Sequence, residues 1–250
     1  MKKKILVVLS ILLIAAMAIT GTVAYLTDEA SDINVMTVGN VYIQQLEYER
    51  DANGNLQKFT QDKPIIPAVY EGNALPWADG QYNWGSIDGV PAEASNQLFR
   101  DGANAVDKFV FVQNVGNTDA YYRTIIAVEC PEGLNPDLIH LNINGNARFT
   151  WTEVGYTEIG GVQFFLMEAL YNEILVPGET SRPSLMQVYL DKDATNEDVA
   201  LFGEKLEIRV VSQAVQADGF SAPNTALDTA FYDVTTDMHP WTAENVASAE

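Results

Sequence analysis

The chain has 250 residues, of which 47% are hydrophobic and 19% are charged, and its formal net charge is −20. This acidic excess disfavours nucleic acid and anionic lipid as partners, because both repel a negative protein surface. Cys130 is the only cysteine, so an intramolecular disulfide is excluded and a packed core has to provide the stability. Length and composition fit a single all-β domain.

The first 24 residues are organised like a cleavable export signal. Lysines at positions 2–4 precede a run from 5 to 19 that is apolar except for Ser10. Residues 22–24 (TVA) suit a signal peptidase, so we expect cleavage between Ala24 and Tyr25. The alternative is an uncleaved membrane anchor, because the run extended to position 23 is nearly long enough to cross a bilayer.

Removal of residues 1–24 takes away three lysines and no acid. The remaining 226 residues then hold 11 Lys and Arg against 34 Asp and Glu, a formal charge of −23. Such a surface favours cations or basic partners; the alternative is that the acidity only keeps an exported protein soluble. We therefore expect a secreted protein that touches a membrane only through the uncleaved leader.

The first part of the exported chain predicts a β-hairpin. Residues 38–49 are rich in Val, Ile and Tyr, and a turn at 51–55 (DANGN) separates them from the run 56–60. The Asn-Gly pair of the turn accepts positive φ at both positions, which favours a hairpin. The turn also matches the start of a calcium loop, but the glycine and the glutamate that such a loop needs later are missing.

Residues 64–104 break this pattern, with frequent Gly, Pro, Asn and Asp and no sustained period. We expect a long loop excursion over the sandwich that contains short elements, because a structureless loop of ~40 residues would be exceptional. Trp77, Tyr82 and Trp84 either anchor the excursion to the core or form an exposed binding surface. Aromatic rings beside carboxylates would also suit a carbohydrate.

Strand patterns resume at residues 107–114, where the run is apolar on both faces. In the next strand, 120–130, every second side chain from Tyr122 to Cys130 lies on one face, and every second side chain from Tyr121 to Glu129 lies on the other. Further strands are predicted at 138–143, 147–154, 162–170, 185–190 and 205–217.

Two short helices complete the predicted elements. Thr195 and Asp198 have the spacing of a capping box for a helix that Gly203 can end. Asn224 is predicted to cap a second helix over 225–231. Many strands with few helices predict an all-β fold, a jelly-roll-like two-sheet sandwich over 37–234. A polar, loosely ordered tail is expected at 235–250.

The sequence offers little for catalysis. His140 lies in a strand pattern, so a Cys130–His140 pair is disfavoured, and Cys130 is expected to be a buried small hydrophobe rather than an exposed thiol that links chains. His239 falls in the polar tail. An acidic cluster could bind calcium through oxygen ligands, although a solvated loop with helix-capping residues is the favoured interpretation. The cluster comprises Asp191, Asp193, Asn196, Glu197 and Asp198.

Three segments carry a resemblance to a known family. Residues 21–28 (GTVAYLTD) with 34–41 (NVMTVGNV) resemble the leader and first strand of the TasA/camelysin family, exported proteins of Gram-positive bacteria that a SipW-type signal peptidase processes. Residues 114–123 (NVGNTDAYYR) are similar to the family's second marker, an Asn-x-Gly turn before a strand that bears arginine. Residues 215–220 (VQADGF) resemble a recurring end of the C-terminal strand.

The resemblance implies a jelly-roll sandwich and, for TasA-like members, assembly into fibres of the biofilm matrix. The N-terminal segment freed by processing adds as a strand to the sheet of the next subunit. The implied partners are further copies of the chain or a related matrix protein, and a SipW-type peptidase during export. By position the donor is residues 25–36, with Tyr25, Leu26, Ile33, Val35 and Met36 as its apolar side chains.

We therefore expect a secreted structural protein without catalytic activity or cofactor. One alternative is a cell-surface adhesin or a calcium- or carbohydrate-binding module, motivated by the aromatic excursion and the acidic loops. The other is a camelysin-like secreted metallopeptidase, which the resemblance alone implies and for which the sequence has no recognisable zinc site.

Overall fold

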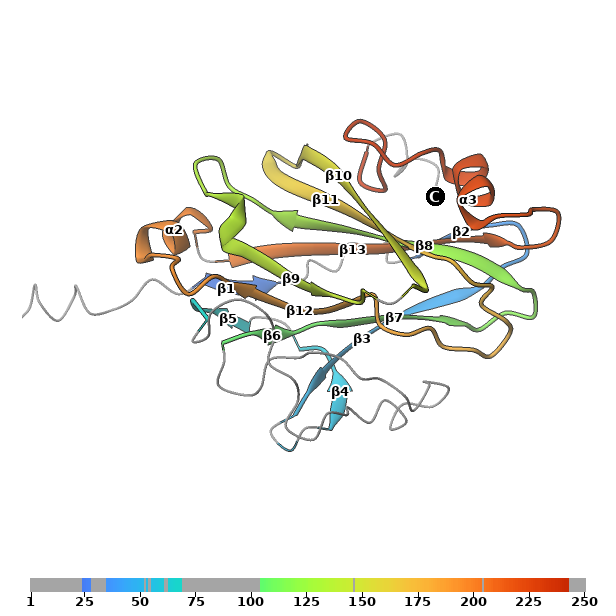
Figure 1. Ribbon diagram of the computed structural model, residues 1–250, viewed down its shortest axis with the longest axis horizontal. Coiled ribbons are helices and arrows are strands. Elements are labelled where there is room, and N and C mark those ends of the chain that lie inside the picture. Colours follow the sequence, from blue (N-terminus) through green and yellow to red (C-terminus); the bar gives the residue numbers. More distant parts are fainter. Residues whose placement is uncertain are drawn as a thin grey trace, which may run out of the picture.

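The computed structural model describes residues 24–27, residues 35–68 without 52, 54, 61 and 62, and residues 104–242 without 146 and 204. These residues form two facing layers of β-strands with two short α-helices at their periphery (Figure 1). The prediction of an all-β sandwich is confirmed, whereas the jelly-roll strand order stays a prediction.

The larger layer is a sheet of seven strands in the order β10-β11-β8-β13-β1-β5, with β2 also paired to β13. Its four long strands are antiparallel neighbours, whereas β1 and β2 run parallel to β13. The strands are β10 (Phe149–Ile159), β11 (Val162–Tyr171), β8 (Ala120–Glu129), β13 (Lys205–Gln216), β1 (Ala24–Thr27), β5 (Lys63–Ile65) and β2 (Val35–Val38).

The second layer combines two three-stranded sheets, β6-β12-β9 and β4-β3-β7. They are joined by the segment leading into β12, since Ser181 N donates to Val112 O (2.8 Å) and Ser184 N to Val110 O (2.9 Å). The strands are β6 (Val106–Asp107), β12 (Leu185–Leu190), β9 (Ile139–Ile143), β4 (Leu56–Lys58), β3 (Ile43–Arg50) and β7 (Phe109–Asn114).

The hairpin predicted from residues 38–60 is confirmed as β3 and β4. Asp51 Oδ1 accepts hydrogen bonds from the backbone N–H groups of Asn53 and Asn55, each at 2.8 Å, and these bonds lower the pKa of the Asp51 carboxyl. This carboxylate therefore stabilises the turn, as side chains of Asp do in Asx-turns.

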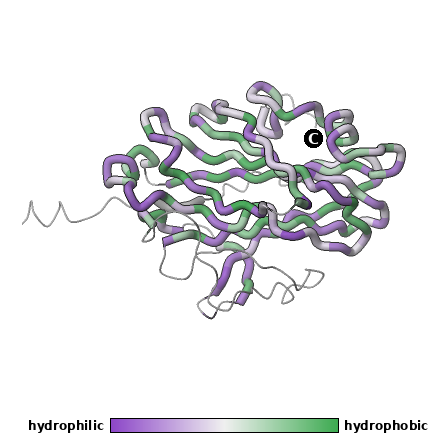
Figure 2. Tube along the Cα trace, viewed as in Figure 1, coloured by the Kyte–Doolittle hydropathy of each residue, from purple (hydrophilic) through white to green (hydrophobic). Residues whose placement is uncertain are grey.

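Apolar side chains fill the space between the layers, and hydrophobic residues recur along the strands of both layers (Figure 2). Strand β7 is apolar on both faces because Val110 and Val112 face this core, whereas Phe109 and Phe111 pack with Met186 in a separate cluster beneath β3 and β4. The two-sided pattern of residues 107–114 thus reflects a strand covered from both sides.

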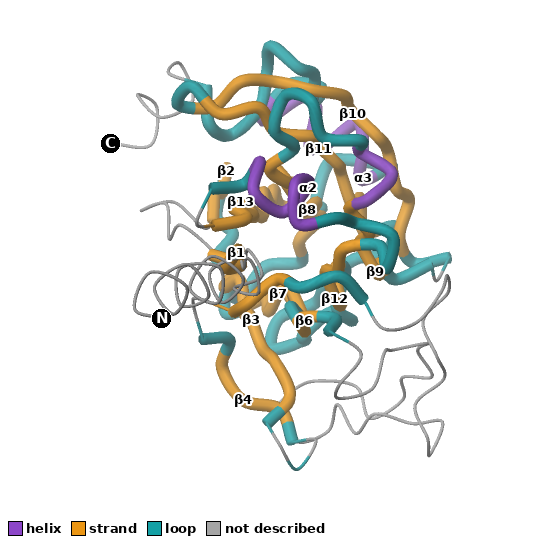
Figure 3. The backbone as a smooth tube through the Cα atoms, turned by 90° about the vertical axis from the view of Figure 1, so that its left-hand side faces the viewer, coloured by secondary structure: helices purple, strands orange, loops and turns teal. Residues whose placement is uncertain are grey.

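The outer face of the larger sheet is covered as well. Helix α3 (Pro223–Phe231) lies beside this sheet (Figures 1 and 3) and packs on Tyr121 and Val215. Trp241 packs on the cluster that contains Ala127. The second face of β8, which carries Tyr121 and Ala127, is therefore buried although strand periodicity alone would allow it to face water.

Two expectations about the C-terminal region are wrong. Helix α3 begins at Pro223 with Ala222 as its N-cap, instead of being capped by Asn224, because proline with its fixed φ suits the first helical position. Residues 235–242 are packed against β10: Thr157 Oγ1 donates to Thr236 O at 2.8 Å, and His239 is 5% exposed. Residues 243–250 lie outside the described part of the chain.

Helix α2 (Asn196–Leu201) forms as predicted. Thr195 Oγ1 accepts from Asp198 N at 3.2 Å while the Asp198 carboxylate accepts from Thr195 N at 2.8 Å, so the capping box is complete. Strand β10 continues five residues beyond its predicted end through a bulge between Glu153 and Gly155. Gly155 has φ +124°, and an added Cβ would lie 3.2 Å from Thr236 Cγ2, so this position requires glycine.

Candidate functional site

The first candidate site is the edge of β13 that faces away from β8, where the N-terminal segment lies (Figure 3). Strand β1 pairs Tyr25 with Lys205 and Leu26 with Leu206, and its other edge pairs with β5. Further along β13, strand β2 pairs Val35 with Ser212. The bond between Ala24 and Tyr25, where cleavage is predicted, lies within β1.

Four of the five predicted assembly residues are thus placed on one sheet edge, and Ile33 lies outside the described residues. Tyr25 and Leu26 belong to β1, whereas Val35 and Met36 belong to β2. Val35 is half-buried against the core, and Met36 Sδ accepts a weak hydrogen bond from Gln213 Nε2 at 3.6 Å. Thr37 and Val38 are exposed, so β2 is attached by its backbone pairing and by the side chains of its first two residues, one on each face.

Gln213 links this edge to a buried arginine on the outer side of the sheet. Arg123 is 1% exposed; its Nε donates to Gln213 Oε1 at 2.8 Å and its Nη2 donates to Tyr232 O at 2.7 Å. Its Nη1 donates to Asp228 at 2.8 Å and to Glu168 at 3.3 Å. Arg123 therefore fastens α3 to β8, β11 and β13.

In this cluster, the buried positive charge of Arg123 is compensated by the carboxylates of Glu168 and Asp228. Burial raises the pKa of the Glu168 carboxyl, and the adjacent guanidinium of Arg123 opposes that shift. Tyr232, just after α3, has φ +66° and ψ 165°, a region nearly restricted to glycine, and its carbonyl is held by Arg123. The sequence placed Arg123 on the same strand face as Tyr121, but it did not indicate these partners.

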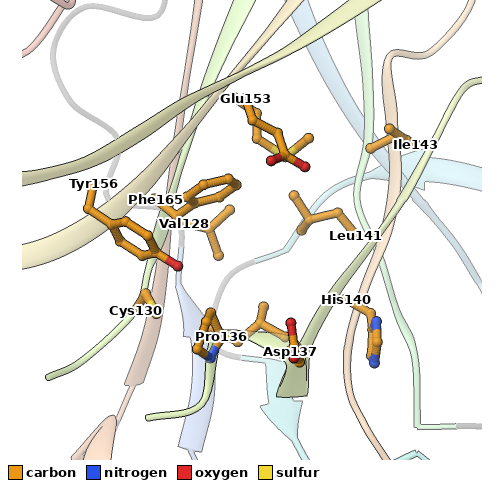
Figure 4. Close-up of a pocket in the computed structure, with 12 residues that line it drawn as sticks. Val128, Cys130, Pro136, Asp137, His140, Leu141, Ile143, Glu153, Tyr156 and Phe165 are labelled. Atoms are coloured by element: carbon orange, nitrogen blue, oxygen red, sulfur yellow. The ribbon is translucent and has the colours of Figure 1, made fainter. Parts of the chain in front are cut away.

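The second candidate site is a cavity of 610 Å³ between the inner face of the larger sheet and β9, close to the edge strands β9 and β10 (Figure 4). Its size falls within the range of small-molecule sites, ~300–1,000 Å³. Most lining side chains are apolar. The lining residues are Val128, Cys130, Pro136, Asp137, Ile139, His140, Leu141, Ile143, Glu153, Tyr156, Phe165 and Met167.

Polar groups lie at the margin of this cavity. Cys130 is buried as predicted, and burial raises the pKa of its thiol, whereas the nearby Tyr156 opposes that shift. Tyr156 packs on Phe165 with ring centroids 5.2 Å apart. Asp137 and Glu153 are exposed residues of the lining, on opposite sides of the cavity (Figure 4).

The structure gives His140 a partner other than Cys130. His140 Nε2 lies 2.9 Å from Asp191 Oδ2, and its ring stacks on Tyr189 with centroids 5.0 Å apart. The pKa of the Asp191 carboxyl is lowered by the backbone N–H of Asp193 and by His140. His140 lies in β9, as predicted, and it lines the same cavity as Cys130 from another strand.

The predicted acidic cluster lies around the start of α2. Asp191 accepts from His140 and from Asp193 N, Asp193 pairs with Lys192 at 2.7 Å, and Asp198 belongs to the capping box. The favoured interpretation, a loop with helix-capping residues, is confirmed for Asp198. Within the described residues, no three His, Cys, Asp or Glu side chains are grouped so that they could hold a metal ion.

Other predicted features fall outside the described residues: the leader before Ala24, the excursion from 69 to 103 with Trp77, Tyr82 and Trp84, and the end of the chain from 243. Helices with the length and hydropathy needed to cross a bilayer do not occur in the part of the chain that the structure describes.

The sequence did not reveal the cavity. Its walls come from β8 with the following Cys130, from β9, β10 and β11, and from the short 3-10 helix Pro136–Leu138, and no single one of these segments indicates a cavity in its local pattern. A comparison of the chain with family models, with curated proteins and with solved structures found no match.

Proposed function

We propose that this protein is an exported, non-catalytic structural protein that assembles into extracellular fibres by strand addition after removal of its leader. The observation that carries the proposal is the position of the N-terminal segment: β1 and β2 lie as added parallel strands on the edge of β13. Strand addition at an open edge is a recognised mode of association, because the backbone groups of the edge pair with any suitable extended segment.

The same edge can accept this segment from the chain itself or from a second copy. In the exchanged form, β1 and β2 of one subunit occupy β13 of the next, with the pairing found within the chain. Exchange of identical elements is an efficient route to association because each intramolecular contact is replaced by an equal intermolecular one. If each subunit donates to the next without closing a ring, the product is a filament.

The residues after β2 support such an exchange. Gly39 has φ +86°, and the chain turns there from β2 towards β3 (Ile43–Arg50). In the closed form, an added Cβ at Gly39 would approach Gln216 Oε1 to 3.1 Å. Glycine at this turn lets the chain leave β13 in more than one direction.

The leader defines when assembly begins. Cleavage between Ala24 and Tyr25 would place the new N-terminus within β1, so that β1 keeps Tyr25, Leu26 and Thr27. The resemblance of residues 21–28 and 34–41 to the TasA/camelysin leader supports this order of events. N-terminal sequencing of the secreted protein tests the cleavage site directly, with Tyr25 expected as the first residue.

A disulfide lock tests the exchange. Val38 and Val215 are registered partners of β2 and β13, so the double substitution Val38→Cys and Val215→Cys, in a Cys130→Ala background, should join the segment to its own sheet. We expect the oxidised variant to stay monomeric under conditions in which the parent forms filaments, and to polymerise after reduction. The single variant Val38→Cys in the same background is the matched control.

Electron microscopy and analytical ultracentrifugation provide the measurement. Deletion of residues 25–36 should also abolish filaments, because it removes β1 and the first two residues of β2. Filaments formed by the oxidised double variant, or by the deletion variant, would contradict assembly by this segment.

A further inference from the structure

We propose that the cavity between β9 and β10 is a binding site for a small amphipathic cation, a molecule with an apolar chain and a protonated amine head. This site is separate from the N-terminal edge of β13 and does not depend on assembly. Figure 4 shows side chains from both layers directed towards one space. The argument rests on the shape, the lining and the charge of that space.

The interior of the cavity suits an apolar chain. Val128 is fully buried and Met167 is 9% exposed, so the floor belongs to the sandwich core. Leu141 and Ile143 of β9 and Phe165 of β11 are half-buried lining residues, which leaves apolar surface open to the cavity. Covering this surface with a hydrocarbon chain would remove apolar area from water, the main favourable term in such binding.

The entrance lies between the outermost described strands of the two layers. Within the described residues, β9 pairs only with β12 and β10 pairs only with β11, so the two strands that flank the entrance are the outermost of their layers. At one end of the entrance, just after β9, Trp151 Nε1 of β10 donates to Asn144 O at 2.9 Å, which joins the two layers there. A chain can therefore enter from the side.

The charge at the entrance selects the head group. Asp137 and Glu153 are exposed lining residues on opposite sides of the cavity, and Lys and Arg are absent from its described lining (Figure 4). The one basic lining residue, His140, lies 2.9 Å from the Asp191 carboxylate. An ammonium head would be attracted to this entrance and a carboxylate head would be repelled by it.

Isothermal titration calorimetry of the processed chain with dodecylamine, dodecanol and dodecanoate, each below its micelle concentration, tests the proposal. We expect one saturable site per chain for dodecylamine, weaker binding of dodecanol, and binding of dodecanoate weaker than that of dodecylamine by about tenfold, the size expected for two exposed carboxylates. Binding of dodecanoate as tight as that of dodecylamine would overturn the assignment of a cation.

Cavity-filling variants test the location. Met167→Trp, from the sheet side, and Leu141→Trp, from β9, are each expected to abolish the saturable site. Val176→Trp is the control, because Val176 is 45% exposed and lies outside the cavity lining. Circular dichroism and thermal unfolding confirm that each variant is folded, and the second variant decides the matter if the first does not fold. Binding that survives in a folded cavity-filling variant would overturn the location.

Neutralising variants separate specific attraction from the general negative charge. The double substitution Asp137→Asn and Glu153→Gln should lower the affinity for dodecylamine about fivefold and leave the affinity for dodecanol unchanged. The control pair Asp218→Asn and Glu158→Gln changes the net charge equally at exposed residues outside the lining and should leave both affinities unchanged. Equal effects of the two pairs would overturn the proposal. The absence of any saturable site for dodecylamine would overturn it as well.

Discussion

Replacing Arg123 by methionine should cost a large part of the free energy of unfolding. Methionine keeps much of the apolar stem of the side chain but removes four hydrogen bonds, to Gln213, Glu168, Asp228 and the carbonyl of Tyr232. The Glu168 side chain is only 12% exposed, so its carboxylate would remain buried without its compensating charge.

The magnitude follows from that uncompensated charge. Removing one partner of a buried ion pair costs about 3–5 kcal/mol, far more than an exposed pair contributes. A domain of roughly this size loses about 2–4 °C in melting temperature per kcal/mol, so Arg123→Met should melt about 6–20 °C below the parent. Arg148→Met is the matched control: Arg148 pairs with Glu173 at 3.1 Å, but their side chains are 37% and 49% exposed. Its expected cost is below about 1 kcal/mol.

Urea unfolding followed by tryptophan fluorescence measures both variants against the parent. A loss for Arg123→Met within about 1 kcal/mol of the loss for Arg148→Met would refute the argument that the cluster holds a compensated buried charge. Adding Glu168→Gln to Arg123→Met should restore part of the stability, since it removes the charge left without a partner. No recovery would mean that the loss has another origin, such as a cavity beneath α3.

Three further predictions concern single residues. Burial raises the pKa of Glu129 from 4.5 to about 7, so the stability that comes from its bound proton is present below pH 4.5 and is lost as the pH rises towards 7. Between pH 4.5 and pH 7, the free energy of unfolding measured in urea should therefore fall by about 1 kcal/mol more in the parent than in Glu129→Gln, after allowing for solvent screening. The control Glu132→Gln, at an exposed residue, should follow the parent. Tyr232→Gly should raise the free energy of unfolding by about 1 kcal/mol, because φ +66° is strained for tyrosine. The control Tyr42→Gly, at an exposed residue without positive φ, should lower it. Changes of the same sign in the two variants, measured by chemical denaturation, would contradict this. Iodoacetamide should label Cys130 fully in urea and very slowly in the folded protein, because the residue is 3% exposed and burial raises the pKa of its thiol. Rapid labelling of the folded chain, measured by mass spectrometry, would count against the burial.

Much of the sandwich could be predicted because its signals are local. The alternation in residues 205–217 and the turn at 51–55 each depend on neighbouring residues, and they reappear as β13 and the β3–β4 hairpin. The capping box of Thr195 and Asp198 is a signal of four residues and is found intact. In these places the local preference and the final structure agree.

Features that depend on distant contacts could not be predicted. Arg123 is placed by strand periodicity on a face that could meet water, but α3, about a hundred residues later, covers it. His239 lies in a polar stretch, and its burial depends on contacts with Thr157 of β10. The cavity has no local signature, because it is a space left between two layers whose strands each look ordinary in sequence.

The parallel pairing of β1 with β13 also sets an order in time. Tyr25 and Lys205 are partners but lie 180 positions apart, so the first strand leaves the ribosome long before its partner exists. At roughly 5–20 residues per second, the interval is on the order of 10–40 s. Contacts between residues that are so distant in sequence also form slowly, which delays the pairing of β1 with β13 further. During synthesis the first strand is therefore without its partner in β13 until residues 205–207 have been made, so the larger sheet can be completed only late in synthesis.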